Sequence, residues 1–278
     1  MLRYKNLSSG STGNATLVEV GNSTGQPSRV LIDCGMRFSL LLEHLVNAQV
    51  QPSEIDAIFI THEHSDHIGC VTQLASGYSI PVWASSGTHA ALQDMQRKLR
   101  AKQPTHSQLL PNFAEFEALV RIAADLCPIE IGGLQLNPFP VPHDAREPLQ
   151  LTCTDGNAKL GILTDLGHAS RHVIEQLVGC NALLLESNHD EDMLSKSKYP
   201  AFLKARVGGD FGHLSNAQAA EVLTSVMHDQ LRHVSAAHLS QQNNHPSLAQ
   251  NALSTVLGCM PAEVLAACPE TGTPWMVV

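Results

Sequence analysis

The residues best suited to chemistry in this chain are crowded into the segment THEHSDH, residues 61–67. The segment contains three imidazole and two carboxylate groups, which at this density are typical ligands of zinc, manganese or iron. A polar loop would explain a single histidine, but not H-x-H-x-D-H directly after the apolar run DAIFI. The segment therefore predicts a metal site at the end of a buried strand.

The order of the ligands within this segment predicts where each side chain points. If the chain stays extended through His62 and His64, these two side chains lie on one side and Glu63 points away, because side chains alternate along a strand. Asp66 and His67 follow where the chain turns into a helix. We therefore expect two pairs of ligands directed at adjacent points, and we expect Glu63 to be dispensable.

Further ligands are available at the ends of other apolar runs. His143 lies in PVPHDAREP, Asp165 in LGILTDLGH and His238 in VSAAHLSQQNN. Each is a polar residue at the edge of a strand-like run, where sheet folds gather their functional groups. These residues would supply the additional ligands that a site with two metal ions needs.

The elements that must position these residues alternate along the chain. Short runs rich in Val, Ile and Leu suggest strands that are buried on both faces. Helical patterns lie between them, and SNAQ (215–218) has the form of a capping box. The simplest architecture is an α/β fold of two sheets face to face with helices on both outer surfaces, as one domain over residues 1–278. The expected helices span 38–47, 67–75, 87–100, 169–178, 215–228 and 246–257.

The composition is that of a packed protein in a reducing compartment. Hydrophobic residues are 43% and charged residues 15% of the 278, which excludes a disordered chain. No apolar run could span a bilayer and the first residues hold no apolar signal core, so we expect a cytoplasmic protein. The seven cysteines are scattered and form no CxxC pair. We expect reduced thiols, with Cys34 and Cys70 as core residues.

The charge is unevenly distributed. The formal net charge of −9 is not that of a general nucleic-acid binder. However, eight of the 17 basic residues lie in two windows without acids, MQRKLRAK (95–102) and LSKSKYPAFLKAR (194–206). Each window alone would be read as a solvated helix face, but together they indicate a surface that faces a polyanion.

The motifs THEHSDH, HDA, TDLGH and the late HLS resemble the metallo-β-lactamase fold superfamily, and LIDCG resembles its usual strand before the first helix. This resemblance spans nearly the whole chain and implies a four-layer αββα sandwich. It also implies two divalent metal ions, zinc or manganese and possibly iron. One ion would be held by His62, His64 and His143, the second by Asp66, His67 and His238, with Asp165 bridging both.

Other segments narrow the resemblance to a subgroup. LSSGSTGNATLVE, VPHDAREP, LLLESNHDEDML, YPAFLKARVGGDFGHLSN and HLSQQNN are similar to the YycJ/WalJ/VicX-type bacterial metallohydrolases, a group associated with exonuclease-like activity on DNA. The site pattern also resembles the tRNA-processing RNase Z enzymes, which implies that Glu186 and His213 assist proton transfer. We therefore expect Asp66, Glu186 and His213 to take part in catalysis.

Two chemical functions fit these residues. Two divalent ions would lower the pKa of a bridging water and supply hydroxide for attack on an electrophile. If this is a phosphodiester of DNA or another nucleic acid, an acid such as His213 is useful because a sugar alkoxide leaves poorly. The alternative is a thioester or lactone, whose leaving group would give His213 little to do. A redox protein or a closed structural metal site does not fit these ligands.

Several other residues near the motifs have weaker assignments. We expect Asp33 to orient a ligand imidazole and His168 to be packed and hydrogen-bonded. The segment SSGSTGN (8–14) could offer backbone N–H groups to a phosphate or be only a hairpin loop. His189 has no assigned role. We expect loops and the 87–125 region to form the rim of the site.

Overall fold

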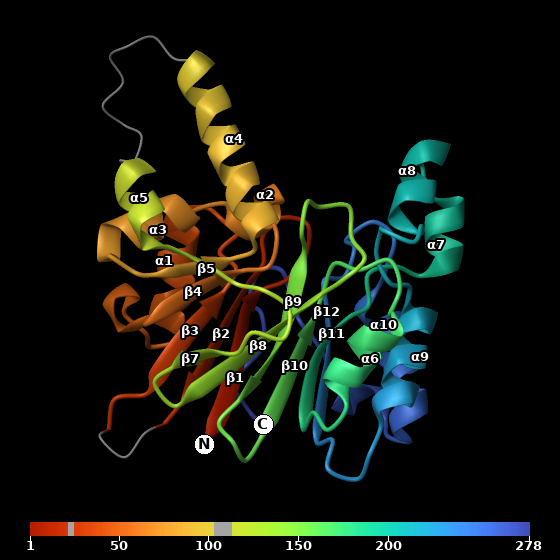
Figure 1. The fold of residues 1–278 in the computed structure, drawn as a ribbon. Coiled ribbons are helices and arrows are strands. Elements are labelled where there is room, and N and C mark those ends of the chain that lie inside the picture. Colours follow the sequence, from red (N-terminus) through yellow and green to blue (C-terminus); the bar gives the residue numbers. More distant parts are fainter. Residues whose placement is uncertain (22–24, 103–112) are drawn as a thin grey trace.

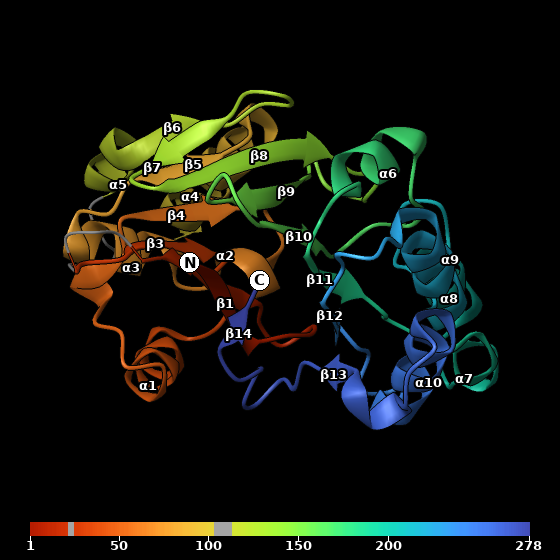
Figure 2. The same ribbon diagram turned by 90° about the horizontal axis from the view of Figure 1, so that it is seen from below.

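The computed structural model describes residues 1–21, 25–102 and 113–278. Within these ranges, two seven-stranded sheets pack face to face, and helices cover both outer surfaces (Figures 1 and 2). The predicted αββα architecture is thereby confirmed. No helix in the described ranges is both long and apolar enough to cross a membrane.

The first sheet has the order β14-β1-β2-β3-β4-β5-β6. Its strands β1 to β3 are antiparallel, whereas β3 to β6 run parallel. The sequence patterns did not predict β1, β6 or β14. The strands are β1 (Leu2–Ser8), β2 (Ala15–Val20), β3 (Ser28–Ile32), β4 (Ala57–Ile60), β5 (Val82–Ala84), β6 (Val120–Ile122) and β14 (Met276–Val277).

The second sheet has the order β13-β12-β11-β10-β9-β8-β7. Here β7 to β10 are antiparallel and β10 to β13 are parallel. The strands are β7 (Ile129–Ile131), β8 (Leu134–Pro140), β9 (Leu149–Thr154), β10 (Lys159–Leu163), β11 (Ala182–Glu186), β12 (His233–Ala237) and β13 (Leu265–Ala266).

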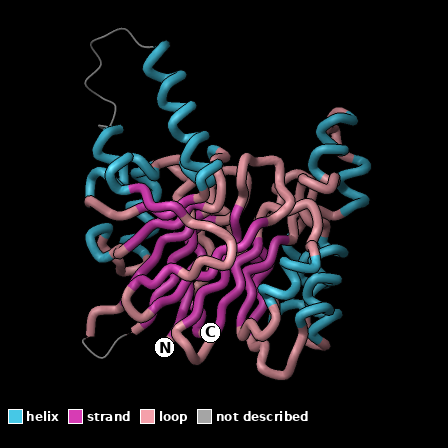
Figure 3. The backbone as a smooth tube through the Cα atoms, in the orientation of Figure 1, coloured by secondary structure: helices cyan, strands magenta, loops and turns pink. Residues whose placement is uncertain are grey.

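The helices divide between the two outer faces (Figure 3). The first half of the chain supplies α1 (Phe38–Asn47), α2 (Ser65–Ile68), α3 (Val71–Tyr78), α4 (Ser86–Lys102) and α5 (Phe113–Leu119), with the 3₁₀ turn η1 (Pro52–Glu54). The second half supplies α6 (Arg171–Leu177), α7 (Glu191–Lys196), α8 (Ala201–Val207), α9 (Asn216–Val226) and α10 (Pro246–Leu257), with η2 (Pro261–Glu263).

The predicted helix over 67–75 is wrong in one respect, because the structure divides it into α2 and α3. The Cys70 N–H donates to the carbonyl of Cys34 at 3.0 Å instead of to its own helix. At Gly69, a side chain would come within 2.6 Å of the Gly35 backbone. The close approach of these two segments interrupts the helix. The predicted capping box of α9 is confirmed at Ser215 and Gln218.

Three apolar clusters hold the four layers together. The central cluster lies between the sheets and includes Tyr4, Phe59 and Leu136. A second packs α1 and α3 on the first sheet, and a third packs α6, α9 and α10 on the second sheet. Burial of this many apolar side chains supplies the main driving force for the sandwich. Figure 1 shows α4, α7 and α8 standing above one edge of this sandwich.

Candidate metal centre

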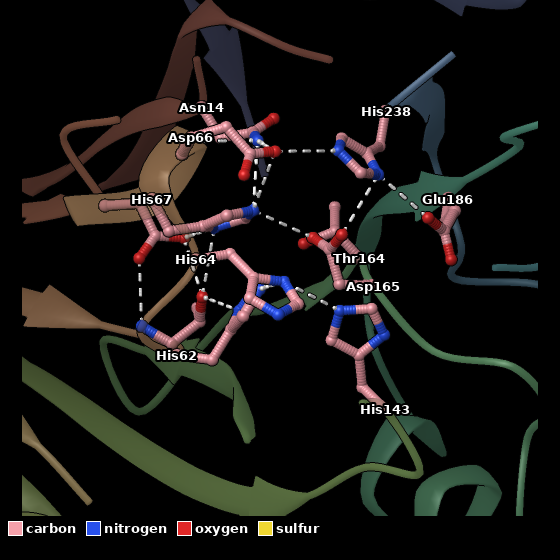
Figure 4. Close-up of polar contacts among 12 residues, drawn as sticks. Asn14, His62, His64, Asp66, His67, His143, Thr164, Asp165, Glu186 and His238 are labelled. Atoms are coloured by element: carbon pink, nitrogen blue, oxygen red, sulfur yellow. Dashed lines mark hydrogen bonds and ion pairs between the residues drawn. The ribbon is translucent and has the colours of Figure 1, made fainter. Parts of the chain in front are cut away.

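The seven predicted metal ligands converge at that edge, between the two sheets (Figure 4). Four come from the first half of the molecule, after β4 and in α2, and three come from the ends of strands in the second sheet. The centre therefore lies at the seam between the sheets. The converging residues are His62, His64, Asp66, His67, His143, Asp165 and His238.

One group of possible ligands consists of three imidazoles. The Nδ1 atom of His64 lies 3.0 Å from Nε2 of His62 and 3.3 Å from Nε2 of His143. One nitrogen of each ring can therefore face a common point, as a bound cation requires. Glu63 points away from these imidazoles, as predicted, and its Oε1 accepts the Arg146 backbone N–H at 2.9 Å.

A second group combines a carboxylate with two imidazoles. The Oδ2 atom of Asp66 lies 3.6 Å from Nε2 of His67 and 3.7 Å from Nε2 of His238. Asp165 lies between the two groups, because its Oδ2 is 3.2 Å from Nε2 of His67 and it also forms a possible ligand set with His62 and His67. The two groups of possible ligands are therefore adjacent, with Asp165 between them.

The backbone is strained where three polar residues leave their strands. Asp33, Asp165 and His238 have φ of 59°, 55° and 54°, the left-handed region that non-glycine residues rarely adopt. Such residues cost about 1–3 kcal/mol each and persist where the surroundings fix them. At Asp165 and His238 the turn directs the side chain into the centre, and at Asp33 it directs the side chain to Nδ1 of His67 behind the centre.

Hydrogen bonds on the far side of the imidazoles fix their orientation. Asp33 behaves as predicted, since its Oδ2 lies 2.8 Å from Nδ1 of His67 and also accepts the Thr61 hydroxyl at 2.9 Å. Nδ1 of His143 lies 3.1 Å from the Gly212 carbonyl. In both rings Nε2 is left facing the centre, which is the arrangement of a metal-bound histidine.

Glu186 is fully buried and joins two histidines. Its Oε1 lies 2.9 Å from Nδ1 of His213 and 2.9 Å from Nδ1 of His238, while its Oε2 accepts the N–H groups of Leu166 and Leu214. Burial opposes ionisation, but the charge of His213 and the hydrogen bonds with His213 and His238 lower the pKa of Glu186 to about 2. Both carboxylate oxygens accept hydrogen bonds, and Glu186 also forms a further group of possible ligands with Asp165, His213 and His238.

The electrostatics and hydrogen bonding of the centre fit a divalent cation. Burial, reinforced by neighbouring imidazoles, holds the pKa of His62 well below its usual value, so the ring is neutral as a ligand must be. Burial opposes charge on Asp165, but His238 and His67 hold its pKa well below normal. Among the described residues, Oδ2 of Asp165 and Nε2 of His238 are buried without a hydrogen-bond partner. These atoms have the lone pairs and the position of ligands.

The 8–14 segment packs against the loops that carry the ligands. The Asn14 N–H donates to the Asp66 carbonyl at 2.8 Å, and the His238 N–H donates to the Ser9 hydroxyl at 2.7 Å. The Asn14 side chain also lies 3.1 Å from Nε2 of His67. The segment is therefore more than a hairpin loop. The sequence analysis did not identify Asn14, whose role depends on contacts more than 50 residues away in the chain.

A cavity of about 370 Å³ opens the centre to solvent. Its walls include five of the predicted ligands and His213, and on the other side residues of the segment that contains α8. His168 is hydrogen-bonded as predicted, with Nδ1 3.0 Å from the Asp210 carbonyl, but it is exposed instead of packed. His189 is buried and has no evident part in the centre.

The two basic windows lie on helices that flank the site. The first window is the end of α4 and the second runs from α7 to α8, and Figure 1 shows both rising above the edge that holds the centre. Arg97 is paired with Asp94, while the side chains of Arg100 and Lys102 lie outside the described residues. The 87–125 region was expected at the rim, but none of its described residues lines the cavity; its helix α4 stands above the same edge (Figure 1), and its residues 103–112 are likewise outside the described part.

The two packed sheets with a histidine–aspartate cluster at one edge define the class of the metallo-β-lactamase fold. The chain belongs to the beta-lactamase superfamily. The family model described as "Beta-lactamase superfamily domain" matches residues 28–234. The match covers most of both sheets and all ligand residues but one, His238.

Curated relatives extend the similarity along the whole chain. The chain is 32% identical to the exodeoxyribonuclease YycJ of Bacillus anthracis, over 92% of this chain and 89% of that protein. It is 28% identical to the exodeoxyribonuclease WalJ of Streptococcus pneumoniae, over 98% and 96%. The crystal structure of the metallo-β-lactamase fold protein YhfI from Bacillus subtilis superimposes with a TM-score of 0.69 at 16% identity, covering 100% of both chains, which supports the fold.

Proposed function

We propose that this protein is a metal-dependent phosphodiesterase that acts as an exonuclease on DNA. The observation that supports the proposal is the Glu186–His213 pair, because His213 lines the cavity at the metal centre and would serve there as a proton donor to a leaving oxygen. Similarity to exodeoxyribonucleases over nearly the full length of the chain supports the choice of substrate.

The seven converging residues would hold two divalent ions, which we propose are zinc or manganese, with iron as a further possibility. One ion would be held by His62, His64 and His143. Asp66, His67 and His238 would hold the second, and Asp165 would contact both. Ions bound there would supply an activated water and positive charge for the phosphoryl group. Asp66 then belongs to the catalytic centre as a ligand.

His213 would donate a proton to the leaving oxygen. Its Nδ1 is engaged by Glu186 at 2.9 Å, so Nε2 is the nitrogen free to act in the cavity that His213 lines. Burial works against charge on His213, but Glu186 more than offsets it and raises the pKa of this imidazole. Glu186 would therefore be a positioning residue that keeps His213 oriented and protonated near neutral pH.

A thioester or lactone hydrolase is the alternative. A thiolate leaves without a proton, so a buried carboxylate that keeps a histidine protonated at the cavity would have no purpose there. Arg206 at the cavity wall and the neighbouring lysines also favour a polyanion over a neutral ester. Both observations support the phosphodiester.

The test compares His213→Ala on two substrates. We expect kcat/KM on DNA to fall ~10²–10⁴-fold, the usual contribution of a positioned acid or base. A nitrophenyl phosphodiester, whose leaving group needs no proton, should lose much less, and the amount of bound metal should not change. His233→Ala is the matched control, because His233 is exposed at the opposite end of β12 from His238. Equal losses on both substrates, or loss of metal, would refute the assignment of His213.

The number of metal ions is tested separately. We expect elemental analysis of the saturated protein to give two divalent ions per chain. His62→Ala should empty one site preferentially, whereas Asp165→Ala should weaken both because that carboxylate lies between the two ligand groups. One ion per chain at saturation would contradict the dinuclear centre.

A further inference from the structure

Two exposed phenylalanines directly precede residues that line the cavity, Leu203 and Gly212. Phe202 on α8 is 75% exposed and Phe211, in the loop after α8, is 60% exposed. Aromatic residues are only 4% of the chain, and in the described ranges the other phenylalanines are buried or partly buried. Exposed rings gathered next to a functional cavity indicate a binding surface.

Arg206 connects the two phenylalanines to the wall of the cavity. Phe202 precedes Arg206 by four residues on α8, so the two side chains are neighbours on one helix face. The Arg206 guanidinium binds Asp144 at 2.6 Å, and the Asp144 N–H donates to the Phe211 carbonyl at 3.1 Å. Arg206 itself lines the cavity together with Tyr199. Phe202 thus lies one helical turn from Arg206, and the backbone of Phe211 is held against Asp144, the partner of Arg206.

The charge around the rings suits the sugar–phosphate backbone. The segment 194–206 has four basic residues and no acid. The Lys204 ammonium binds the Ser195 carbonyl at 2.6 Å, a neutral partner that leaves its charge uncompensated. Outside this segment and the basic window 95–102, the chain is strongly acidic. Because Lys196 is paired with Asp192 and Arg206 with Asp144, Lys204 supplies the charge that would attract a polyanion to this rim.

This rim is held firmly against His213. The His213 N–H donates to the Val207 carbonyl at 2.8 Å at the end of α8. A side chain at Gly212 would overlap the carbonyls of Arg206 and Val207, so the loop packs tightly on the helix. A ligand bound to the rings would therefore be held in a fixed position relative to His213.

We propose that Phe202 and Phe211 form a stacking platform for unpaired bases of a single polynucleotide strand, with its phosphates directed towards Lys204 and Arg206. Rings that stack on bases bind single strands, because bases in a duplex are already stacked on each other. The cavity of about 370 Å³ has the size of a small-molecule site, which suits one nucleotide and not a duplex. This inference rests on the proposed function and adds that the substrate is bound as a single strand.

The test measures binding separately from cleavage. The metal-loaded protein is titrated with a labelled oligothymidylate that carries non-hydrolysable phosphorothioate linkages, and kcat/KM is measured on the matching natural oligonucleotide. We expect Phe202→Ala and Phe211→Ala each to weaken binding roughly 5- to 100-fold, the range for one lost base–aromatic stack. Leu126→Ala, which removes a remote side chain that is 65% exposed, should change nothing.

Two further comparisons isolate stacking from simple apolar contact. Phe202→Trp keeps a planar ring and should bind like the wild type, whereas Phe202→Leu should bind like Phe202→Ala. An oligonucleotide with abasic residues next to the cleaved linkage should lose affinity for the wild type by the same factor. In the double variant Phe202→Ala/Phe211→Ala, the abasic and the natural oligonucleotide should bind with the same affinity.

The outcomes separate this inference from the proposed function. Unchanged affinity in the alanine variants, or leucine equal to tryptophan, would overturn the stacking platform and leave the nuclease proposal standing. Ring-dependent binding without cleavage of any oligonucleotide would support the platform and overturn the nuclease proposal. If the alanine variants convert a dimer to a monomer without weakening oligonucleotide binding, a second copy of the chain covers the rings, and the platform is refuted.

Discussion

Carboxylates around the histidine cluster differ in role because their surroundings differ. Asp66 and Asp165 face the centre, and one oxygen of Asp165 has no hydrogen-bond partner among the described residues. Asp33 and Glu186 lie behind imidazoles and have their oxygens occupied. Glu63 turns outwards and accepts the backbone N–H of Arg146, which lies in the loop after β8. Position relative to the rings therefore separates ligands from groups that orient ligands.

The role of Asp33 gives a prediction at the scale of one atom. In Asp33→Asn the new side chain has the same shape as aspartate, but the negative charge 2.8 Å from Nδ1 of His67 is lost. A less basic and less firmly oriented imidazole should bind metal about 10–100-fold more weakly, the usual cost of removing such a partner. Competition with a chromophoric chelator measures the affinity.

Glu63→Gln is the matched control for Asp33→Asn. It also removes one carboxylate charge near the cluster, but its oxygen can still accept the Arg146 N–H. We expect metal affinity and activity to stay near the wild-type values. A loss in Glu63→Gln equal to that in Asp33→Asn would mean that net charge, and not the orientation of His67, governs metal binding.

At the scale of elements, the sequence predicted those features that depend on residues close together in the chain. The ligand segment after β4 was recognisable because imidazoles and carboxylates at fixed spacing follow a buried strand. The bounds of α1 and α10 were predicted because each has a clear apolar period and punctuation at its ends. His143, Asp165 and His238 were found because each ends an apolar run.

Elements without a strong period of their own were not predicted. Helices α7 and α8 are only six and seven residues long, and tertiary contacts such as the packing of Gly212 on α8 fix them. The contacts of Asn14 with Asp66 and His67 join segments that are far apart in sequence, so no spacing could reveal them. The break between α2 and α3 has the same origin, in the contact of Gly69 with Gly35.

The loop after β3 offers a prediction about elements. A side chain at Gly35 would overlap the Asp66 carbonyl and lie 2.6 Å from the His67 backbone nitrogen. Gly35→Ala should therefore displace α2, with loss of metal from the second group of ligands and a lowered melting temperature. Gly77→Ala is the control, since that position on α3 has open space around it and alanine favours a helix by roughly 0.5–1 kcal/mol. Normal metal content in Gly35→Ala would show that the ligand loop can move aside freely.

At the scale of the whole molecule, the centre depends on how the two sheets are held together. The ligands after β4 and in α2 belong to the first sheet, and those after β8, β10 and β12 belong to the second. The sheets are joined mainly by the apolar cluster between them. A direct polar link also crosses this layer, because the Tyr4 hydroxyl on β1 lies 2.9 Å from the Ser235 hydroxyl on β12. Ser235 precedes His238 by three residues, so the link lies on the strand that delivers a ligand.

Removing this link should reduce stability without affecting the ligands directly. Tyr4→Phe keeps the ring but leaves the Ser235 hydroxyl buried without its partner, which costs about 1–3 kcal/mol. Urea denaturation of the metal-free protein at pH 7 measures the change in the free energy of unfolding. A change near zero would indicate that the apolar cluster alone sets the spacing between the sheets.

The same variant predicts a difference at alkaline pH. Burial raises the pKa of Tyr4 from about 10 to about 12, with the Ser235 hydrogen bond opposing the shift only in part. A group whose pKa is raised by folding stabilises the fold fully below its unfolded pKa and loses that contribution as the pH rises towards the folded value. The wild type should therefore lose about 2 kcal/mol more than Tyr4→Phe between pH 10 and pH 12, out of about 2.7 kcal/mol over the whole transition, since one pKa unit corresponds to 1.36 kcal/mol. Other tyrosines and lysines titrate in both proteins, so the difference between the two unfolding curves isolates Tyr4. Parallel curves over this range would show that Tyr4 ionises in the folded protein as easily as in the unfolded chain, and that the layer between the sheets admits water.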